Sequence, residues 1–268
     1  MKISPHFSQG EKCILPGKIG CVPYLNSRPL IFGIEKWVRF DVPSVLARAL
    51  RQGELDVALA PVTESFEHSG YRILPGMAIG CRGPVRSVYL VHRAPIANLK
   101  TVALDPASQT SNLLLRVVLA EFFGLSPRYE IPSSADPASF DAQLQIGDPA
   151  LRAREQWAHQ GFHLLDLGEL WWEQTQLPFV FAFWALRETM DPSPWIKLLT
   201  EAKTRGIENI DQMIATQNVA PADMARSYLT RCIRYDLGEQ ELKGIAEFQR
   251  LCVKHGFLAR TADLRLAG

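Results

Sequence analysis

The sequence lacks most of the motifs that identify common enzyme classes. It contains no GxGxxG, GxxxxGK[ST], HExxH or GxSxG pattern, which removes the usual support for dinucleotide binding, P-loop phosphoryl transfer, zinc-dependent proteolysis and serine hydrolysis. The histidines are scattered without the spacing of a metal site: His6, His68, His92, His159, His163 and His255. We therefore expect no metal ion and no organic cofactor.

Cysteine pairs and long apolar runs are also missing. The cysteines form no CxxC pair and have no histidine at zinc spacing, so we expect reduced, buried side chains: Cys13, Cys21, Cys81, Cys232 and Cys252. No window approaches the roughly 18 uninterrupted apolar residues of a membrane span. The lead over residues 1–17, to which we assign no role, lacks the apolar run of about 7–15 residues of an export signal. We expect a cytoplasmic protein with no membrane partner.

The charge is balanced and spread along the chain. The sequence contains 29 Lys and Arg and 28 Asp and Glu, which gives a net charge of +1. It has no basic stripe of the kind that indicates a nucleic-acid-binding surface. Recognition of a charged ligand must therefore be local. The length of 268 residues, 47% of them hydrophobic, is enough for one large domain or for two lobes of roughly 100–150 residues each. The oligomeric state is left open.

Apolar patterning predicts strands that alternate with helices up to about residue 190, followed by helices alone. We expect strands over residues 18–22, 55–60, 87–91, 99–104, 129–132, 142–146, 163–167 and 179–186. The helices of the C-terminal tail are expected over residues 195–202, 207–217, 221–233 and 239–255. This order predicts an α/β fold with two lobes, mostly parallel sheets and a helical C-terminal tail.

Short polar clusters follow several of these strands. They are Tyr24 to Ser27, Pro61 to Ser65, Ser108 to Ser111, and Gly147 with Asp148. In open α/β sheets ligands bind at the carboxyl ends of strands, so we expect these clusters around one small-molecule cleft.

Each cluster also has a purely structural interpretation. The Asn26 amide can donate and accept hydrogen bonds, but Asn26 is equally well placed to cap a helix. Glu64 is the only carboxylate of its cluster that could act as a base, although a glutamate in a first helical turn usually complements the helix dipole. Gly147 and Asp148 equally resemble a helix start.

The cluster that precedes a strongly apolar helix combines the two interpretations. Ser108, Thr110 and Ser111 lie where the free N–H groups and the positive end of the helix dipole can hold a carboxylate or phosphate. Capping by these hydroxyls is compatible with anion binding.

Taken in order, these clusters resemble the chorismate dehydratase family, the first enzymes of the futalosine route to menaquinone. The resemblance covers roughly residues 18–258 and rests on the segments GCVPYLNSRPL, GELDVALAPVTES, VRSVYLV, VALDPASQTSNLLLRVVL, LQIGDPAL, DLGELWWEQTQLPFVFAFWAL and YLTRCIRYDLGEQELKGIAEF. The sister enzyme of that route, 1,4-dihydroxy-6-naphthoate synthase, shares the fold, but the YLN and RPL block resembles the dehydratase more closely. The chain departs from the family in its longer N-terminal lead and in Cys21-Val22-Pro23.

The resemblance implies a type II periplasmic-binding-protein-like fold with a ligand cleft between two α/β lobes. Lobe one would comprise residues 18–92 and 181–268, and lobe two residues 93–180. The implied reaction removes water from chorismate, a small dianion, to give 3-[(1-carboxyvinyl)oxy]benzoate. It needs no cofactor, because formation of an aromatic ring drives it. A solute-binding or sensor protein on the same fold is the alternative from another class.

The resemblance and the reaction chemistry together suggest roles for ten residues. Asn26 and Ser87 would act in catalysis, and Glu64 would be the base unless the enolpyruvyl carboxylate of the substrate takes the ring proton itself. Substrate binding would fall to the remaining candidates: Tyr24, Thr63, Arg86, Ser108, Thr110, Ser111 and Gly147.

Overall fold

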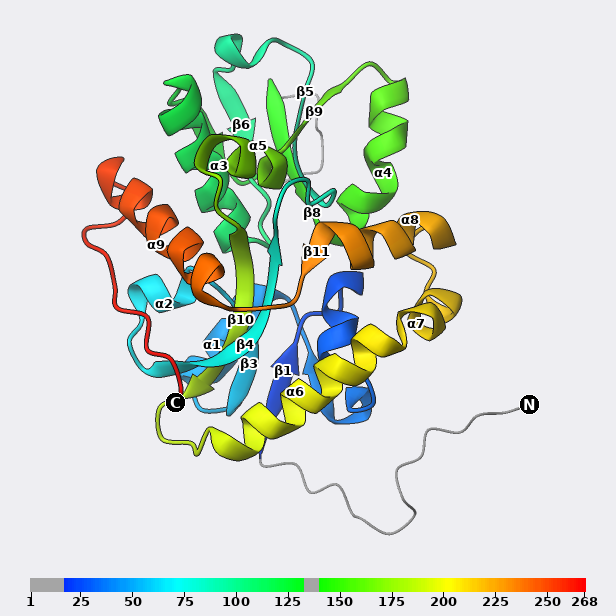
Figure 1. Ribbon diagram of the computed structural model, residues 1–268. Coiled ribbons are helices and arrows are strands. Elements are labelled where there is room, and N and C mark those ends of the chain that lie inside the picture. Colours follow the sequence, from blue (N-terminus) through cyan, green and yellow to red (C-terminus); the bar gives the residue numbers. More distant parts are fainter. Residues whose placement is uncertain (1–16, 133–139) are drawn as a thin grey trace.

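The computed structural model describes residues 17–132 and 140–268 and places them in two α/β lobes, one above the other in Figure 1. Within these residues the first sheet holds, in spatial order, β11 (Ile233–Arg234), β4 (Tyr71–Cys81), β10 (Phe179–Arg187), β3 (Val57–Pro61), β1 (Ile19–Cys21) and β2 (Val38–Phe40). The second sheet holds β7 (Arg128–Glu130), β6 (Thr101–Ala103), β8 (Ala142–Ile146), β5 (Val88–His92) and β9 (His163–Asp166).

Helices follow most strands and cover the sheets. The first lobe carries the 3-10 helices η1 (Leu25–Ile31) and η2 (Glu35–Trp37), and the α-helices α1 (Pro43–Arg51) and α2 (Glu64–Glu67). The second carries η3 (Ile96–Asn98), α3 (Gln109–Phe123), α4 (Gly147–His159) and α5 (Leu167–Thr175). The tail contains α6 (Ser193–Glu208), α7 (Ile210–Thr216), α8 (Ala222–Ser227), the π-helical turn η5 (Tyr228–Cys232) and α9 (Glu239–Lys254).

Both sheets are mixed, whereas the alternation of strands and helices predicted mostly parallel sheets. The parallel pairs are β1 with β2 and β3, and β6 with β7 and β8. β5 is antiparallel to β8 and β9, and β10 is antiparallel to β3 and β4. β5 and β10 are the first strands that the chain forms after each crossing between lobes. The direction of these strands is set by the crossing and not by local apolar patterning.

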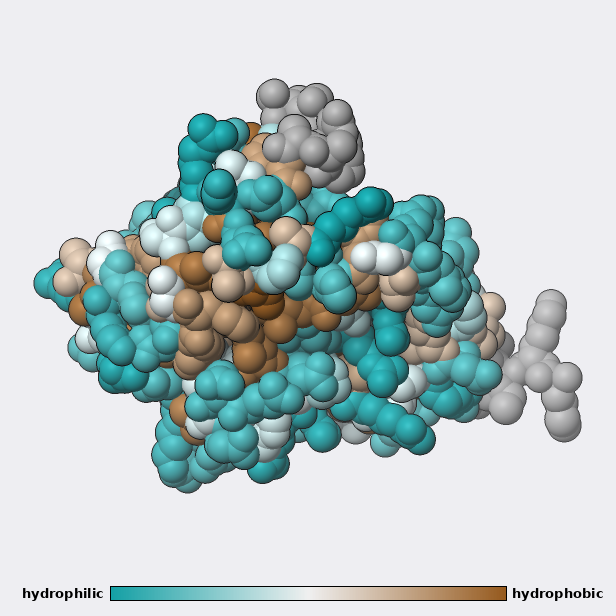
Figure 2. Space-filling model, turned by 90° about the horizontal axis from the view of Figure 1, so that it is seen from above, coloured by the Kyte–Doolittle hydropathy of each residue, from teal (hydrophilic) through white to brown (hydrophobic). Residues whose placement is uncertain are grey.

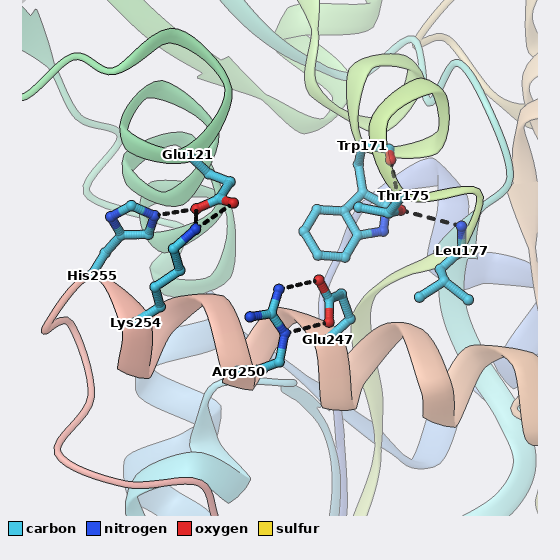
Figure 3. Close-up of polar contacts among 8 residues, drawn as sticks. All are labelled: Glu121, Trp171, Thr175, Leu177, Glu247, Arg250, Lys254 and His255. Atoms are coloured by element: carbon cyan, nitrogen blue, oxygen red, sulfur yellow. Dashed lines mark hydrogen bonds and ion pairs between the residues drawn. The ribbon is translucent and has the colours of Figure 1, made fainter.

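The sheets also locate the two crossings. The division expected above puts residues 88–92 in lobe one and residues 179–180 in lobe two. In the structure β5 belongs to the second sheet, and Phe179 and Val180 pair with β4 in the first. Thr175 Oγ1 donates to Trp171 O and accepts from the Leu177 N–H at the end of α5, as Figure 3 shows. We therefore propose that the chain crosses over residues 82–87 and returns over residues 176–178.

The helical tail holds the lobes together. Its last helix, α9, packs against both β10 of the first sheet and α3 of the second lobe. At this contact the Glu121 carboxylate of α3 accepts from Lys254 Nζ at 2.8 Å and lies 2.5 Å from His255 Nε2 (Figure 3). The tail is interrupted by β11, which adds an edge strand beside β4.

Most of the apolar core forms one cluster that contains residues of both lobes, and a second, small cluster contains Tyr89, Val91 and Ala150. The largest fully buried side chains of the core are tryptophans of three elements, Trp171, Trp184 and Trp195. The described cysteines are buried and free, as predicted: Cys21, Cys81, Cys232 and Cys252. Cys13 lies outside the described residues. On the outer face of the second lobe, Figure 2 shows apolar residues gathered centrally and surrounded by hydrophilic ones.

Candidate active site

A pocket lined by residues of both lobes encloses about 630 Å³, part of it open to solvent. Apolar side chains such as Leu59, Ile79 and Phe181 form much of its wall. Seven of the residues singled out in the sequence also line it: Tyr24, Asn26, Ser87, Ser108, Thr110, Ser111 and Gly147. Among the described residues that line the pocket there is no Lys, Arg, Asp or Glu. Its polar groups are therefore neutral hydroxyls, amides and backbone groups.

The direction of β5 explains why Ser87, which precedes a strand, lies beside residues that follow strands. Ser87 precedes β5, but β5 is antiparallel to β8, with Val88 opposite Ile146. The amino end of β5 therefore lies beside the carboxyl end of β8, where Gly147 follows. The Gly147 N–H donates to the Ser87 carbonyl at 2.8 Å. Gly147 has a φ of +66°, a left-handed conformation that glycine adopts at little cost.

Ser87 belongs to a buried polar cluster with a tyrosine of the C-terminal tail. The side chain of Ser87 is 1% exposed, and its Oγ accepts a hydrogen bond of 2.9 Å from the Tyr228 phenol. The Asn26 side chain hydrogen-bonds to the same phenol. Asn26 Oδ1 is buried and has no protein partner among the described residues. Asn26 lines the pocket, so a buried acceptor with no protein donor in the described part of the chain lies at the pocket wall.

The amino end of α3 supplies a second polar group of the pocket. Ser108 caps this helix, since its Oγ accepts from the Ser111 N–H at 3.1 Å. The hydroxyls of Ser108, Thr110 and Ser111 are all buried within the lining. Free N–H groups and the positive end of the dipole of a 15-residue helix therefore meet the pocket here.

Thr63 contacts this group without lining the pocket itself. Its Oγ1 lies 3.4 Å from Thr110 Oγ1, a contact between the first lobe and the second. Tyr24 also lines the pocket and lies next to Gly147, where a Cβ would stand 3.5 Å from the tyrosine ring. Burial raises the pKa of Tyr24, and the charges of Asp105 and Asp148 add to that rise.

Glu64 is directed away from the pocket. Its carboxylate is 3% exposed, pairs with the Arg51 guanidinium and accepts a hydrogen bond of 3.1 Å from the Tyr71 phenol. His68 Nε2 lies 3.9 Å from the same carboxylate. Glu64 is not part of the pocket lining, so the structure does not bring it together with Asn26 and Ser87.

Arg86 contributes its backbone, and its side chain is outside the pocket lining. Its φ of +59° is unusual for a residue other than glycine. The Asp166 carboxylate stabilises this conformation by accepting from the Arg86 N–H at 2.7 Å and from the Val85 N–H at 3.1 Å. The turn that carries Ser87 is thus fixed by a buried carboxylate of the second lobe.

Two residues around the pocket were not singled out in the sequence as part of the site: Tyr228 and Asp166. Tyr228 begins the last segment on which the family resemblance rests, YLTRCIRYDLG, and that was the available signal. Asp148, which the sequence placed in a polar cluster with Gly147, accepts from the Leu25 N–H at 3.0 Å and so ties α4 to η1 of the other lobe. Nothing in the local sequence marks Asp166 as a support for residues 85–86.

The described residues contain neither a metal-binding cluster nor a membrane-crossing helix. Among them, no group of three or more His, Cys, Asp or Glu residues is arranged to hold a metal ion. No helix in that part of the chain is long and apolar enough to cross a bilayer.

Several solved structures share this architecture. A protein from Archaeoglobus fulgidus superposes with a TM-score of 0.72 at 17% identity, over 90% of this chain and 98% of that one. A Candida albicans gene product described as having the generic periplasmic binding protein fold gives a TM-score of 0.64 at 15% identity, over 92% of each chain. The aliphatic sulphonate binding protein of Escherichia coli gives a TM-score of 0.59 at 17% identity, over 93% of this chain and 90% of that one. The expected periplasmic-binding-protein fold is confirmed.

Sequence comparison identifies the family. The chain is 30% identical over 257 residues to the chorismate dehydratase of Thermus thermophilus, an alignment that covers 87% of this chain and 94% of that protein. The family described as menaquinone biosynthesis matches residues 17–254. Because that match spans nearly the whole chain, the protein belongs to the menaquinone biosynthesis family.

Proposed function

We propose that this protein dehydrates chorismate to 3-[(1-carboxyvinyl)oxy]benzoate. The observation that carries the proposal is the 30% identity, over 87% of the chain, with a chorismate dehydratase. The pocket supports it, because apolar walls suit the carbon ring while buried hydroxyls and a helix N-terminus suit carboxylates.

The reaction places defined demands on the protein. A proton leaves the ring carbon that bears the ether oxygen, and the charge spreads through the diene into the ring carboxylate. The bond to the neighbouring hydroxyl then breaks, and the hydroxide leaves as water once it gains a proton. The protein must therefore stabilise charge on the ring carboxylate and assist the leaving hydroxyl.

The amino end of α3 is suited to the first demand. Ser108, Thr110 and Ser111 surround free N–H groups of the helix and are themselves hydroxyl donors. In a buried site with few competing waters such dipoles interact strongly with a developing negative charge. A carboxylate of the dianion can therefore be held without a lysine or arginine.

Asn26 and Ser87 are suited to the second demand. The Ser87 hydroxyl accepts from Tyr228, which leaves its own hydrogen to donate to the leaving hydroxyl. The unpartnered Asn26 Oδ1 accepts a donor of the substrate. Together they orient the substrate with its breaking bonds aligned.

The base in this proposal is the enolpyruvyl carboxylate of the substrate. The described lining contains no ionisable carboxyl group, and Glu64 is paired with Arg51 outside it. The ring proton passes to the substrate carboxylate, and the departing hydroxide recovers one proton. Both carboxylates of the product are then ionised, so no net proton is consumed.

The test is incubation of the purified protein with chorismate, followed by mass analysis for the loss of one water. We expect wild-type turnover and a fall in kcat/KM of about 100-fold or more for Ser87→Ala and for Asn26→Ala. Ser65→Ala is the matched control, because the Ser65 hydroxyl donates to the Val62 carbonyl outside the pocket lining.

A wild-type protein that leaves chorismate unchanged contradicts the proposal. Binding without turnover would then favour a solute-binding or sensor protein. Neither binding nor turnover would favour the reaction of the sister enzyme, 1,4-dihydroxy-6-naphthoate synthase.

A further inference from the structure

Tyr228 reaches the pocket from the C-terminal tail. It is the first residue of the π-helical turn η5 and its side chain is 1% exposed. Its phenol donates to Ser87 Oγ at 2.9 Å across 141 residues of sequence. π-helical turns are rare and occur frequently at functional sites.

Both partners of this hydrogen bond are held in place by the same strand end. Immediately after η5 the chain forms β11, and Ile233 pairs with Cys81 at the end of β4. Ser87 lies just beyond that end, in the turn whose Val85 and Arg86 N–H groups Asp166 binds. The distance between the phenol and Ser87 Oγ is therefore constrained from both sides.

The hydrogen bond determines where the Ser87 hydroxyl can point. A serine hydroxyl has one hydrogen to donate, and the oxygen accepts separately. Because Ser87 Oγ accepts the hydrogen of Tyr228, its own hydrogen is directed away from the phenol, and Ser87 lines the pocket. Burial raises the pKa of Tyr228, and hydrogen bonds with Ser87 and Asn26 oppose that rise only in part, so the phenol stays a neutral donor.

The same phenol orients Asn26. The Asn26 side chain hydrogen-bonds to Tyr228 while its Oδ1 has no partner among the described residues. The bond is therefore made by the amide nitrogen, which donates to the phenol oxygen. Oδ1 is left available to a ligand as an acceptor.

We propose that Tyr228 is a positioning residue, which sets the Ser87 hydroxyl as a donor and Asn26 Oδ1 as an acceptor toward the substrate. The inference rests on the proposed dehydration of chorismate. Tyr228 itself acts through the two side chains that touch the substrate.

The test compares Tyr228→Phe with Tyr235→Phe. Tyr235 is a second buried tyrosine of the tail, and its hydroxyl has no partner among the described residues. We expect Tyr228→Phe to lower kcat by about 10- to 100-fold with KM changed less than about threefold, and Tyr235→Phe to change neither. In a Ser87→Ala background, Tyr228→Phe should add only the smaller loss that acts through Asn26, because most of its effect passes through the serine hydroxyl.

A second variant keeps the shape and the hydrogen bond of residue 228. Fluorinated tyrosine at this position has a lower phenol pKa, so the donor is lost by ionisation at lower pH. We expect the alkaline limb of the kcat profile to move to lower pH than in the wild type, which a merely structural role would not produce.

Three results would overturn the inference if the wild-type protein turns chorismate over. The first is a kcat of Tyr228→Phe within about threefold of the wild type, and the second is a Tyr228→Phe effect on kcat that is as large in the Ser87→Ala background as in the wild type. The third is an alkaline limb of the kcat profile that does not move when residue 228 is a fluorinated tyrosine. A wild-type protein that forms no product overturns the proposed function itself, and this inference with it.

Discussion

The polar side chains that line the pocket are uncharged, and this bears on how the proposed dianionic substrate would be bound. Hydroxyls and N–H groups that are fixed by the fold need no reorientation when charge develops on the ligand. Asn26, Ser87 and Ser111 are each buried or half-buried on elements of regular structure or in a turn held by hydrogen bonds. The proposed recognition is therefore local, which agrees with the net charge of +1.

The first prediction concerns Glu64. We expect Glu64→Gln to turn chorismate over within about threefold of the wild-type rate, because its carboxylate pairs with Arg51 outside the pocket lining. Thermal unfolding should occur at lower temperature, since a buried ion pair with the 3%-exposed carboxylate is lost. Steady-state kinetics and a melting curve of the same preparation measure both effects.

Glu67→Gln is the matched control, because Glu67 lies on the same short helix and is exposed. A folded Glu64→Gln protein that loses turnover by more than about 100-fold, with Glu67→Gln active, would return Glu64 to the role of the base.

Among the elements, the turn that precedes β5 is held by several hydrogen bonds. Arg86 has a left-handed backbone, and Asp166 at the start of α5 binds four N–H groups: those of Val85, Arg86, Gly168 and Glu169. A single carboxylate thus caps one helix and positions the residue next to Ser87. Such strain persists at functional sites only where the surroundings compensate for it.

We predict that Asp166→Asn damages both stability and turnover. One side-chain oxygen can still accept N–H groups, but the amide nitrogen would face the Arg86 N–H or its neighbours, donor against donor. The free energy of unfolding should fall by about 1–3 kcal/mol and kcat should fall with it. Chemical denaturation and chorismate turnover are the measurements.

Asp141→Asn separates the two effects. Asp141 also accepts backbone N–H groups, those of Lys100 and Thr101, but it is not in the pocket lining. The Asp141→Asn variant should be less stable than the wild type but should turn chorismate over at the wild-type rate. Equal losses of turnover in both variants would show that the Asp166 effect is not specific to the turn at Ser87.

At the scale of the whole molecule, polar contacts between the lobes surround the pocket. Leu25 with Asp148, Thr63 with Thr110, and Ser87 with Tyr228 join elements of different lobes or of the tail. Farther from the pocket, Glu121 of α3 binds the end of α9 through Lys254 and His255 (Figure 3). The C-terminal tail therefore helps to stabilise the arrangement of the two lobes.

We predict that Glu121→Gln weakens this contact in a pH-dependent way. Hydrogen bonds from Lys254 and then His255 lower the pKa of Glu121 below its ordinary value of 4.5. The stabilisation is therefore present above that pH and is lost as the pH falls through the lower pKa of the folded state. At neutral pH the variant should lose about 0.5–1 kcal/mol of unfolding free energy, and the difference should vanish in acid.

Glu247→Gln provides the control on the same helix. Glu247 pairs with Arg250 within α9 and not with another element (Figure 3). Its loss should amount to about 0.2–0.5 kcal/mol. Urea denaturation of both variants at neutral and acidic pH measures their unfolding free energies. If Glu121→Gln is still less stable than the wild type in acid, the ionised Glu121 carboxylate is not the cause of the difference.

Much of this arrangement can be predicted from local patterns. The apolar runs predict eight of the described strands but miss β2, β4 and β11. Polar clusters that follow strand ends predict six of the candidate residues that line one pocket, whereas Ser87 was suggested by the family resemblance. Glu64 and Arg86 could not be assigned in this way. Glu64 follows β3 closely, but Arg51 of α1, which pairs with it, belongs to another element. Arg86 adjoins Ser87, but it takes a left-handed conformation in a turn held by Asp166, and its side chain is outside the pocket lining.

By itself the sequence determined the α/β class and the family and predicted a small-molecule cleft, because periodicity, strand-end clusters and motifs are properties of neighbouring residues. Only the tertiary structure decided the direction of β5 and β10, the partner of Glu64, and the contact of Tyr228 with Ser87. The physical reason is chain crossing: residues separated by 141 positions meet only when two lobes and a tail pack against the same strand end.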